Sequence, residues 1–185
     1  MKDGIRIIGG RFKGRKISVP PTDLRPTISM VKEAVFDIID DKIKGAIVLD
    51  LFAGSGNYGI EAFSRGAKQV DFVDRNGKSC KTIKENLKEL GLKANVFSLD
   101  FRNFLKRWNC SYDFIFASPP YFLGFEDEIL NCIFKYQRLK EDGILFLQIF
   151  KKIDPDLSNF IILDERRYGI TKLYILKNKV NKEDS

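Results

Sequence analysis

The sequence predicts an α/β fold, a doubly wound and mostly parallel sheet of seven strands whose last strand runs antiparallel. Three observations support this prediction. From residue 46 onward, apolar runs alternate with amphipathic stretches. A glycine-rich turn joins the first of these runs to the first amphipathic stretch. The last two apolar runs lie too close together for a helix, so a hairpin should connect them.

A β-hairpin and a helix are predicted ahead of this sheet. Residues 5–9 and 15–19 are short apolar–polar runs, and basic residues surround Phe12 in the segment between them. We expect Phe12 to be exposed at the hairpin tip. Prolines at positions 20 and 21 end the second strand, and apolar residues from position 30 to 39 then recur at helical spacing, with Thr27 or Ser29 as the N-cap.

The remaining elements alternate as the fold requires. Strands are predicted at residues 46–51, 69–74, 94–98, 112–117, 143–149, 160–166 and 172–177, and helices at 57–66, 76–90, 101–108 and 126–138. Residues 165–169 are predicted to form the turn that reverses the final strand. We expect one domain over residues 1–185, made of a basic hairpin extension (1–26), a catalytic core (27–178) and a polar tail (179–185).

The composition excludes several classes of protein and site. A chain of 185 residues can bury a single core, and no apolar stretch approaches the ~20 residues that span a bilayer, so a cytoplasmic monomer without membrane contact is expected. Histidine is absent, which excludes Ser-His-Asp and Cys-His nucleophiles and most zinc sites. The three cysteines form no C-x-x-C pair, so neither a metal site nor a disulfide framework is predicted.

Positive charge is concentrated at the N-terminus. The formal net charge is +7, and residues 1–33 contain eight basic and three acidic side chains, a local balance of +5. Lysine and arginine contacts to phosphate provide most of the non-specific affinity for nucleic acid, so the basic block favours a polyanionic partner. A solvated surface without a partner is the alternative.

The glycine-rich turn spans Asp50–Gly59. Gly54, Gly56 and Gly59 satisfy the pattern G-x-G-x-x-G, whose glycines permit a tight turn and the close approach of a ligand to the backbone. Asp74 follows about twenty residues after this turn, at the end of the next apolar run, as in dinucleotide-binding folds. Taken alone, the turn suits a nicotinamide cofactor equally well.

A second motif, Ala117–Tyr121, closes the fourth predicted strand with a serine, two prolines and a tyrosine. The amino nitrogen of a nucleobase is a poor nucleophile, because its lone pair is delocalised into the ring. Ser118 and the carbonyl beside Pro119 could accept the two amino hydrogens and leave the lone pair facing an electrophile, while Tyr121 stacks on the base. The candidate catalytic residues are Ser118, Pro119, Pro120 and Tyr121.

The two motifs together favour methyl transfer over hydride transfer. Asp50 lies where a carboxylate can meet the ammonium group of S-adenosylmethionine, and a dehydrogenase needs neither this aspartate nor the Ser-Pro-Pro-Tyr motif. An antiparallel last strand is likewise typical of class I methyltransferases. Methyl transfer to an exocyclic nitrogen requires no covalent enzyme intermediate, which agrees with the absence of histidine.

Six segments of the chain closely resemble the bacterial RsmD family, whose members methylate the N2 amine of a guanine in 16S ribosomal RNA. The resemblance extends from residue 5 into the last strand, and its N-terminal motifs are the specific part. The matching segments are Arg6–Gly10, Gly14–Arg15, Leu24–Thr27, Leu49–Gly56, Glu61–Ala62 with Ser64–Ala67, and Pro119–Tyr121.

The resemblance implies S-adenosylmethionine as cofactor and 16S ribosomal RNA, within an assembled small ribosomal subunit, as partner. The implied cofactor residues are Asp50, Phe52, Ala53, Gly54, Ser55 and Gly56 for the methionine portion, Asp74 for the ribose, Asp100 and Phe101 for the adenine, and in addition Arg75 and Ser118. The candidate RNA-binding residues, chosen from the basic N-terminal block and the segment that follows it, are Arg6, Arg11, Phe12, Lys13, Arg15, Arg25 and Thr27.

The residues themselves support part of this assignment. A carboxylate at the end of a second strand, such as Asp74, can accept hydrogen bonds from both ribose hydroxyls. Asp100 follows the third strand, where an adenine amine needs an acceptor, and it is equally suited to cap the helix that begins at Phe101.

One position departs from the family and keeps other functions open. The family usually has aspartate or asparagine where this chain has Ser118, and a hydroxyl is a weaker acceptor than a carboxylate. Serine at this place is familiar in enzymes that methylate cytosine N4 in DNA. The alternatives are therefore a DNA methyltransferase acting on adenine N6 or cytosine N4, and a non-catalytic RNA-binding protein with a methyltransferase fold.

Overall fold

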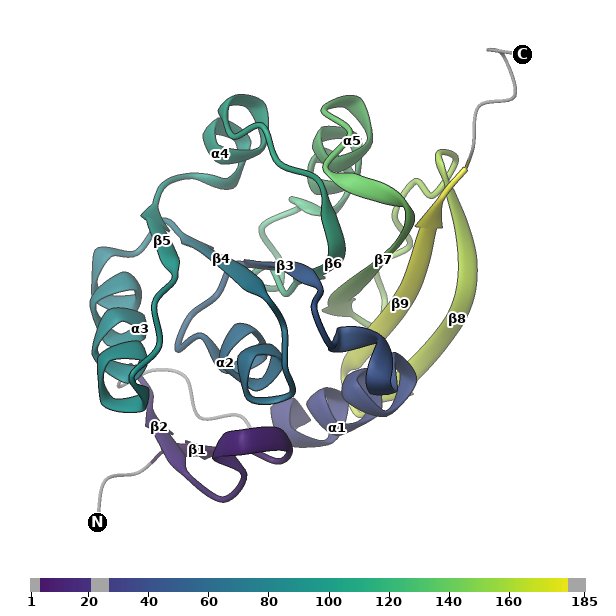
Figure 1. The fold of residues 1–185 in the computed structure, drawn as a ribbon. Coiled ribbons are helices and arrows are strands. Elements are labelled where there is room, and N and C mark those ends of the chain that lie inside the picture. Colours follow the sequence, from purple (N-terminus) through teal and green to yellow (C-terminus); the bar gives the residue numbers. More distant parts are fainter. Residues whose placement is uncertain (1–3, 21–26, 180–185) are drawn as a thin grey trace.

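A computed structural model describes residues 4–20 and 27–179 of the protein. Figure 1 shows a seven-stranded sheet with strand order β5-β4-β3-β6-β7-β9-β8 and a separate two-stranded sheet, β1-β2. The strands of the large sheet are β3 (Ile47–Leu51), β4 (Gln69–Asp74), β5 (Asn95–Ser98), β6 (Tyr112–Ala117), β7 (Leu139–Phe150), β8 (Phe160–Tyr168) and β9 (Thr171–Asn178). Each of the seven predicted strands is present.

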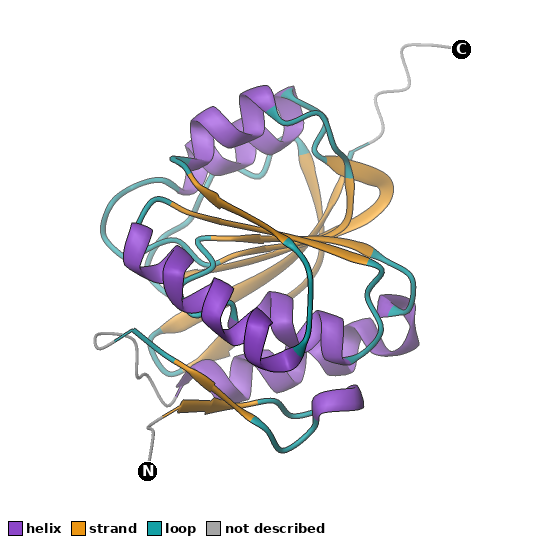
Figure 2. Cartoon of the chain, turned by 60° about the vertical axis from the view of Figure 1, so that its left-hand side comes forward, coloured by secondary structure: helices purple, strands orange, loops and turns teal. Residues whose placement is uncertain are grey.

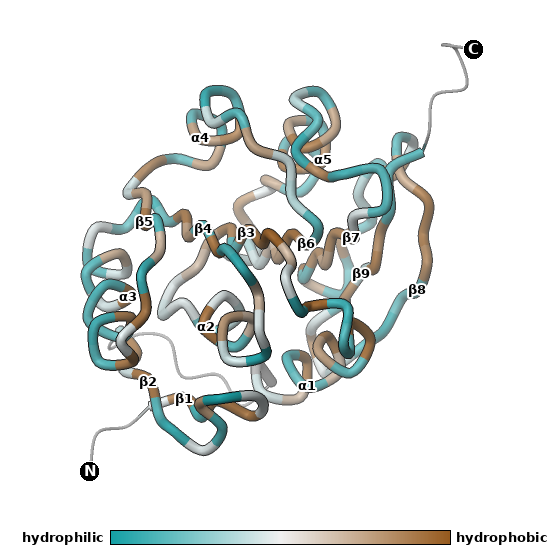
Figure 3. The backbone as a smooth tube through the Cα atoms, viewed as in Figure 1, coloured by the Kyte–Doolittle hydropathy of each residue, from teal (hydrophilic) through white to brown (hydrophobic). Residues whose placement is uncertain are grey.

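Helices cover both faces of the sheet, as Figure 2 shows. On one face, α1 (Thr27–Ile39), α2 (Asn57–Ser64) and α3 (Gly77–Leu90) bury their apolar residues in one core cluster. On the other face, α4 (Phe101–Arg107) and α5 (Glu126–Lys135) pack into a second cluster. The central strands are mainly apolar, as Figure 3 shows, because both of their faces are buried in this way. The predicted doubly wound fold is confirmed.

The last strand reverses direction, as predicted. β3, β4, β5, β6 and β7 pair in parallel, whereas β9 is antiparallel to both of its neighbours, β7 and β8. The turn is shorter and begins later than predicted, because β8 continues to Tyr168 and the chain reverses around Gly169, which has a φ of 59°. Charged residues can lie within β8 because this edge strand is largely exposed to solvent. β7 also begins earlier than predicted, at Leu139.

The N-terminal segment forms a smaller hairpin than predicted. Its strands are β1 (Gly4–Arg6) and β2 (Lys16–Ser18), and a short 3₁₀ turn, η1 (Gly10–Phe12), lies between them. A further 3₁₀ turn, η2 (Asp40–Ile43), follows α1.

The prediction that Phe12 is exposed at the hairpin tip is wrong. Phe12 is only 7% exposed, and its backbone N–H donates to the Ser64 hydroxyl at 2.9 Å. Gly10 explains the difference. Its φ is 70°, and a Cβ at this position would lie 1.8 Å from the carbonyl oxygen of Ser64, so glycine alone lets η1 pack directly against the end of α2. That close approach carries Phe12 into the core.

A buried carboxylate attaches the hairpin to the rest of the molecule. Glu61 of α2 is fully buried and accepts hydrogen bonds from the backbone N–H groups of Ile8 at 2.9 Å and Gly9 at 2.8 Å. It also pairs with Lys32 of α1 at 3.1 Å and with Arg65 at 2.9 Å. Burial lowers the pKa of Lys32, an effect that the charge of Glu61 opposes. The hairpin is thus held in a defined position beside α1 and α2.

Within the described part of the chain, no helix combines the length and apolar character needed to cross a bilayer.

Candidate active site

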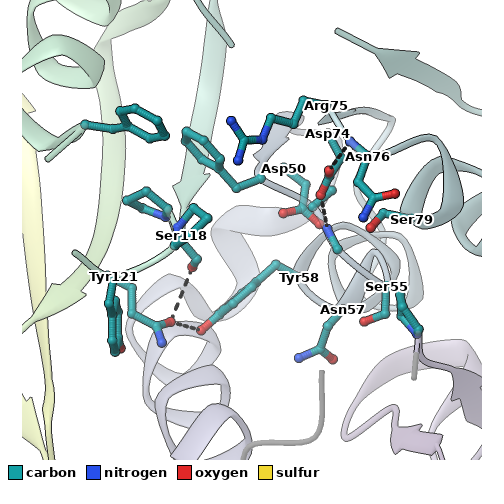
Figure 4. A pocket seen from close by; sticks show the side chains of 18 of the residues that line it. Asp50, Ser55, Asn57, Tyr58, Asp74, Arg75, Asn76, Ser79, Ser118 and Tyr121 are labelled. Atoms are coloured by element: carbon teal, nitrogen blue, oxygen red, sulfur yellow. Dashed lines mark hydrogen bonds between the residues drawn. The ribbon is translucent and has the colours of Figure 1, made fainter. Parts of the chain in front are cut away.

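A cavity of about 370 Å³ opens at the carboxyl ends of β3, β4 and β6. This is the edge of a doubly wound sheet where ligands bind. Figure 4 shows Asp50 and Asp74 on one side of the cavity and Ser118 and Tyr121 on the other. The lining residues that the sequence had singled out are Asp50, Phe52, Ala53, Gly54, Ser55, Asp74, Arg75, Ser118, Pro119, Pro120 and Tyr121.

The glycine turn brings backbone to the cavity floor. Phe52, Gly54 and Gly56 have φ values of 65°, 55° and 79°, so three residues of the turn adopt the left-handed conformation. Such a conformation is costly for phenylalanine and occurs mainly where a site requires it. Gly59 has a different role, since a Cβ there would lie 2.3 Å from a ring carbon of Phe72. This glycine lets α2 pack closely against β4.

Asp50 is a buried carboxylate at the end of β3. It is 3% exposed, and its Oδ2 accepts a hydrogen bond from the backbone N–H of Gly59 at 2.8 Å. The pKa of Asp50 is raised to about 7, chiefly by burial; the hydrogen bond from Gly59 opposes this rise and the nearby charge of Asp74 adds to it. Within residues 4–20 and 27–179, no basic side chain forms an ion pair with Asp50. A cation in the cavity would favour the ionised form.

Asp74 ends β4 with both carboxylate oxygens already oriented. Its Oδ2 accepts from the backbone N–H of Gly54 at 2.9 Å, and its Oδ1 accepts from that of Asn76 at 2.7 Å. A carboxylate has about four lone-pair sites, so each oxygen keeps one for a further donor. Two adjacent hydroxyl groups could therefore bind here. Arg75 is exposed beside it.

Asp100 caps α4, which was one of the two predicted roles. Its Oδ1 accepts from the backbone N–H of Arg102 at 3.0 Å, and the Arg102 guanidinium pairs with the same carboxylate at 3.0 Å. Asp100 and Phe101 also line a small hollow beside the main cavity, and Phe52 and Phe125 belong to the walls of both. The hollow itself has a volume of only about 10 Å³, so a planar heterocycle would lie over its aromatic walls, with its amino group toward the Asp100 carboxylate.

The Ser-Pro-Pro-Tyr corner follows β6 directly. Ser118 lies at the cavity wall, and its hydroxyl donates to Oε1 of Gln148 at 3.3 Å. The hydroxyl groups of Tyr121 and Thr171 lie 2.6 Å apart, which holds the Tyr121 ring at the cavity. Phe122, the next residue, is 72% exposed and has a φ of 68°.

Sequence reasoning missed three residues that form this part of the cavity. Tyr58 of α2, Gln148 of β7 and Thr171 of β9 line it, and the Tyr58 hydroxyl donates to Gln148 Oε1 at 2.9 Å. The available signal was a polar residue inside an otherwise apolar strand, as at Gln148. A single such residue is too weak a pattern to assign to a site.

The hairpin borders the cavity at one end only. Ile5 of β1 and Pro20 line the cavity, whereas Arg11 and Lys13 lie at the other end of the hairpin and are exposed. Arg6 and Arg15 are also exposed, and the Arg15 guanidinium donates to the carbonyl of Glu89 at 2.9 Å. Among the other predicted RNA-binding residues, Arg25 lies outside the described residues, as does the side chain of Thr27 at the start of α1.

The three cysteines are free, and the described residues contain no cluster of three or more histidine, cysteine or acidic side chains arranged to hold a metal ion.

Comparison with known proteins decides the family. A family model described as "Conserved hypothetical protein 95" matches residues 5–177. A protein of Bacillus subtilis named "Putative rRNA methyltransferase YlbH" is 37% identical over 95% of this chain and 100% of its own length. A "Ribosomal RNA small subunit methyltransferase D" from Buchnera aphidicola is 36% identical over 80% of this chain and 79% of its own. The chain belongs to the RsmD family.

The fold comparison agrees with this assignment. The solved structure of the "Putative methyltransferase yhhF from Escherichia coli" superposes with a TM-score of 0.88 and 28% sequence identity, covering 97% of this chain and 100% of the other. The RsmD-family chain is therefore a methyltransferase with a class I fold, as the motifs and the antiparallel last strand predicted.

Proposed function

We propose that this RsmD-family protein transfers a methyl group from S-adenosylmethionine to the N2 amine of a guanine in small-subunit ribosomal RNA. The names of its relatives support ribosomal RNA as the substrate. The observation that carries the proposal is the composition of one cavity, in which the acidic strand ends Asp50 and Asp74 face the Ser118–Tyr121 corner.

The residues around the turn fit the cofactor. When bound, S-adenosylmethionine supplies an electrophilic methyl group on a sulfonium ion. Asp50 would pair with its ammonium group, and this pairing would favour the ionised form of a carboxylate whose pKa burial raises to about 7. Asp74 would accept the two ribose hydroxyls through its remaining lone pairs, and the hollow beside Phe101 and Asp100 would hold the adenine.

The corner would hold the target amine. Ser118 and the Pro119 carbonyl accept its two hydrogens, and Tyr121, fixed through Thr171, stacks on the base. The lone pair then points to the methyl group. Catalysis by such positioning is effective, since the effective molarities of well-oriented groups reach ~10⁵ M or more. The proton of the methylated amine leaves to water, so no histidine is needed.

Access to this cavity requires the guanine to leave its surroundings in the RNA. A base inside a helix cannot reach the corner, so the nucleotide would be turned out into the pocket. The exposed Arg11 and Lys13 of the hairpin would contact the phosphate backbone, whose charge provides most of the affinity.

A second candidate function is methylation of an amine in DNA, and Ser118 favours it because serine is familiar at this position in cytosine-N4 methyltransferases. The two functions are separated by label incorporation. Tritiated S-adenosylmethionine is incubated with the protein and one of three substrates: small ribosomal subunits from cells lacking the protein, naked 16S ribosomal RNA, or duplex DNA. We expect label in ribosomal RNA, recovered as N2-methylguanosine after digestion. Label in DNA, or in a different nucleoside, would contradict the proposal.

The same assay tests the corner. Ser118→Ala should slow methyl transfer about 10-fold or more, because a substrate N–H loses its acceptor, while the cofactor Kd measured by calorimetry stays unchanged. Ser111→Ala is a matched control, since the Ser111 hydroxyl donates to the Gln137 carbonyl at 2.7 Å, away from the cavity. Failure of the wild type to bind the cofactor would instead indicate a non-catalytic RNA-binding protein.

A further inference from the structure

Three polar side chains from three different elements meet at a single oxygen atom in the cavity wall. Oε1 of Gln148, on β7, accepts from the Tyr58 hydroxyl of α2 at 2.9 Å and from the Ser118 hydroxyl at 3.3 Å. Figure 4 draws the two contacts as dashed lines that start at the labelled side chains of Ser118 and Tyr58. The arrangement couples the buried helix α2 to the serine that would hold the substrate.

The hydrogen of the Ser118 hydroxyl is the critical atom. A hydroxyl can donate or accept, depending on how it rotates, whereas the proposed function needs Ser118 as an acceptor for a substrate N–H. A hydroxyl hydrogen pointing into the cavity would oppose that N–H. The carbonyl oxygen of Gln148 carries no hydrogen and can only accept, so its contact with Ser118 directs the hydroxyl hydrogen away from the substrate. The lone pairs then face the cavity.

Tyr58 determines which end of the Gln148 amide faces Ser118. Its ring packs against Phe36 and Phe116, with centroids 6.4 Å and 5.2 Å away, so the hydroxyl has a fixed position. Burial raises the pKa of Tyr58, and the hydroxyl therefore stays protonated and donates. A donor at this place selects the carbonyl end of the Gln148 amide, because the NH₂ end could not accept from it.

We propose that Tyr58 and Gln148 are positioning residues that hold the Ser118 hydroxyl in its accepting orientation toward the substrate amine. This inference rests on the proposed function. It also explains how serine can stand where the family usually has aspartate or asparagine. A carboxylate needs no orientation to accept, whereas a hydroxyl does, and Tyr58 with Gln148 provides it.

The test removes only the Tyr58 hydroxyl. Tyr58→Phe keeps the ring in the core and releases the Gln148 amide, which can then turn its NH₂ toward Ser118. We expect kcat for methyl transfer to small ribosomal subunits to fall about 3- to 10-fold, with KM for the subunits and cofactor Kd unchanged. Tyr112→Phe is the matched control, because Tyr112 is a fully buried tyrosine that donates to Asp71 at 2.8 Å on the other side of the sheet. Its kcat should equal that of the wild type.

A second pair of variants shows whether Tyr58 acts through Ser118. In a Ser118→Asp background there is no hydroxyl to orient, and a released Gln148 NH₂ can donate to the carboxylate, so adding Tyr58→Phe should not lower kcat. In a Ser118→Ala background it should also have no further effect, which is the non-additivity expected of two residues in one hydrogen-bond chain. A purely structural role for Tyr58 would lower kcat equally in all three backgrounds.

The outcomes separate the inference from the proposed function. An active wild type with an equally active Tyr58→Phe variant overturns the inference alone, and so does an equal loss in every background. If DNA proves to be the substrate, the same comparison is made with DNA. A wild type that methylates neither nucleic acid overturns the proposed function, and this inference with it.

Discussion

The protonation of Asp50 should control cofactor affinity between pH 5.5 and 7.5. Burial raises the pKa of Asp50 to about 7 in the free protein. Only the ionised carboxylate can pair with the ammonium group of the cofactor, so affinity should rise with pH through this range. The chain contains no histidine, and therefore no imidazole titrates in the same window.

The size of the effect follows from this pKa. With a pKa of about 7, roughly 3% of Asp50 is ionised at pH 5.5 and about 75% at pH 7.5, so the association constant should rise about 25-fold, or ~1.9 kcal/mol. S-adenosylhomocysteine is a suitable probe for calorimetry, because it carries the same ammonium group. That group lies beside its own carboxylate and stays protonated over this range.

Asp50→Asn is the informative variant. The amide can still accept the Gly59 N–H but cannot change its charge, so binding should be weaker and independent of pH over this range. Wild-type affinity that does not change with pH, or an equal slope in the variant, would refute the assignment of Asp50 to the ammonium.

The effect on folding has the opposite sign and provides a check. Because the pKa of Asp50 is raised from 3.8 to about 7 in the folded protein, the folded state holds this proton more tightly than the unfolded chain. The contribution of Asp50 to stability is thus fully present below about pH 4 and is lost as the pH rises through about 7. Cofactor affinity should therefore rise with pH while the contribution of Asp50 to folding stability falls. A rise in affinity over this pH range cannot be explained by a more stable fold.

Three further predictions concern the packing and the surface. Glu61→Ala should lower the free energy of unfolding by about 3–5 kcal/mol in chemical denaturation, because it leaves the ammonium of Lys32 buried without its partner. Gly59→Ala should cost about 1–3 kcal/mol in the same measurement, since its Cβ would lie 2.3 Å from an aromatic carbon of β4. Arg11→Ala combined with Lys13→Ala should weaken ribosomal RNA binding and reduce the log–log salt slope by roughly 1.4, which a filter-binding titration over several salt concentrations would measure.

Each of these predictions has a matched control. Glu61→Gln also removes the negative charge beside Lys32 and keeps an acceptor for only one of the two hairpin N–H groups, so it should lose nearly as much stability as the alanine variant. A glutamine variant as stable as the wild type would contradict the account of the buried ion pair. Gly77→Ala meets only the Ser98 hydroxyl, at 4.0 Å, and should change stability by less than about 0.5 kcal/mol. Alanine at Lys106 and Arg107, which are exposed on α4 across the sheet, should leave the salt slope unchanged. If the salt slope also fell in this control variant, the loss of RNA binding would be due to the change in net charge and not to contacts made by Arg11 and Lys13.

The strand ends of the site could be predicted because they depend on residues that are neighbours in sequence. Apolar runs located the strands, and Asp50, Asp74 and Ser118 each follow the end of one run. Parallel strands bring their carboxyl ends to one edge of a sheet, so these three residues were expected to lie near one another. All three line the cavity of the structure.

Phe12 could not be placed in the same way. The sequence shows an aromatic residue between two basic ones and a nearby glycine, a pattern that suits an exposed turn. Whether the turn faces solvent depends on the surface of α2, more than fifty residues away in sequence, where the Ser64 hydroxyl accepts a hydrogen bond from the backbone N–H of Phe12. No local pattern records that contact.

The sequence by itself determined the fold class, the family motifs and the strand ends that carry acidic and Ser-Pro-Pro-Tyr chemistry, because periodicity and motifs act over a few adjacent residues. Only the tertiary structure decided that Phe12 is buried and that Gln148 lies between Tyr58 and Ser118. The physical reason is that a hydrogen-bond partner is selected by packing. The pairing of β6 with β7 and the packing of α2 against the sheet bring these three side chains together. The residues adjacent in sequence to Tyr58, Ser118 or Gln148 do not indicate either packing contact.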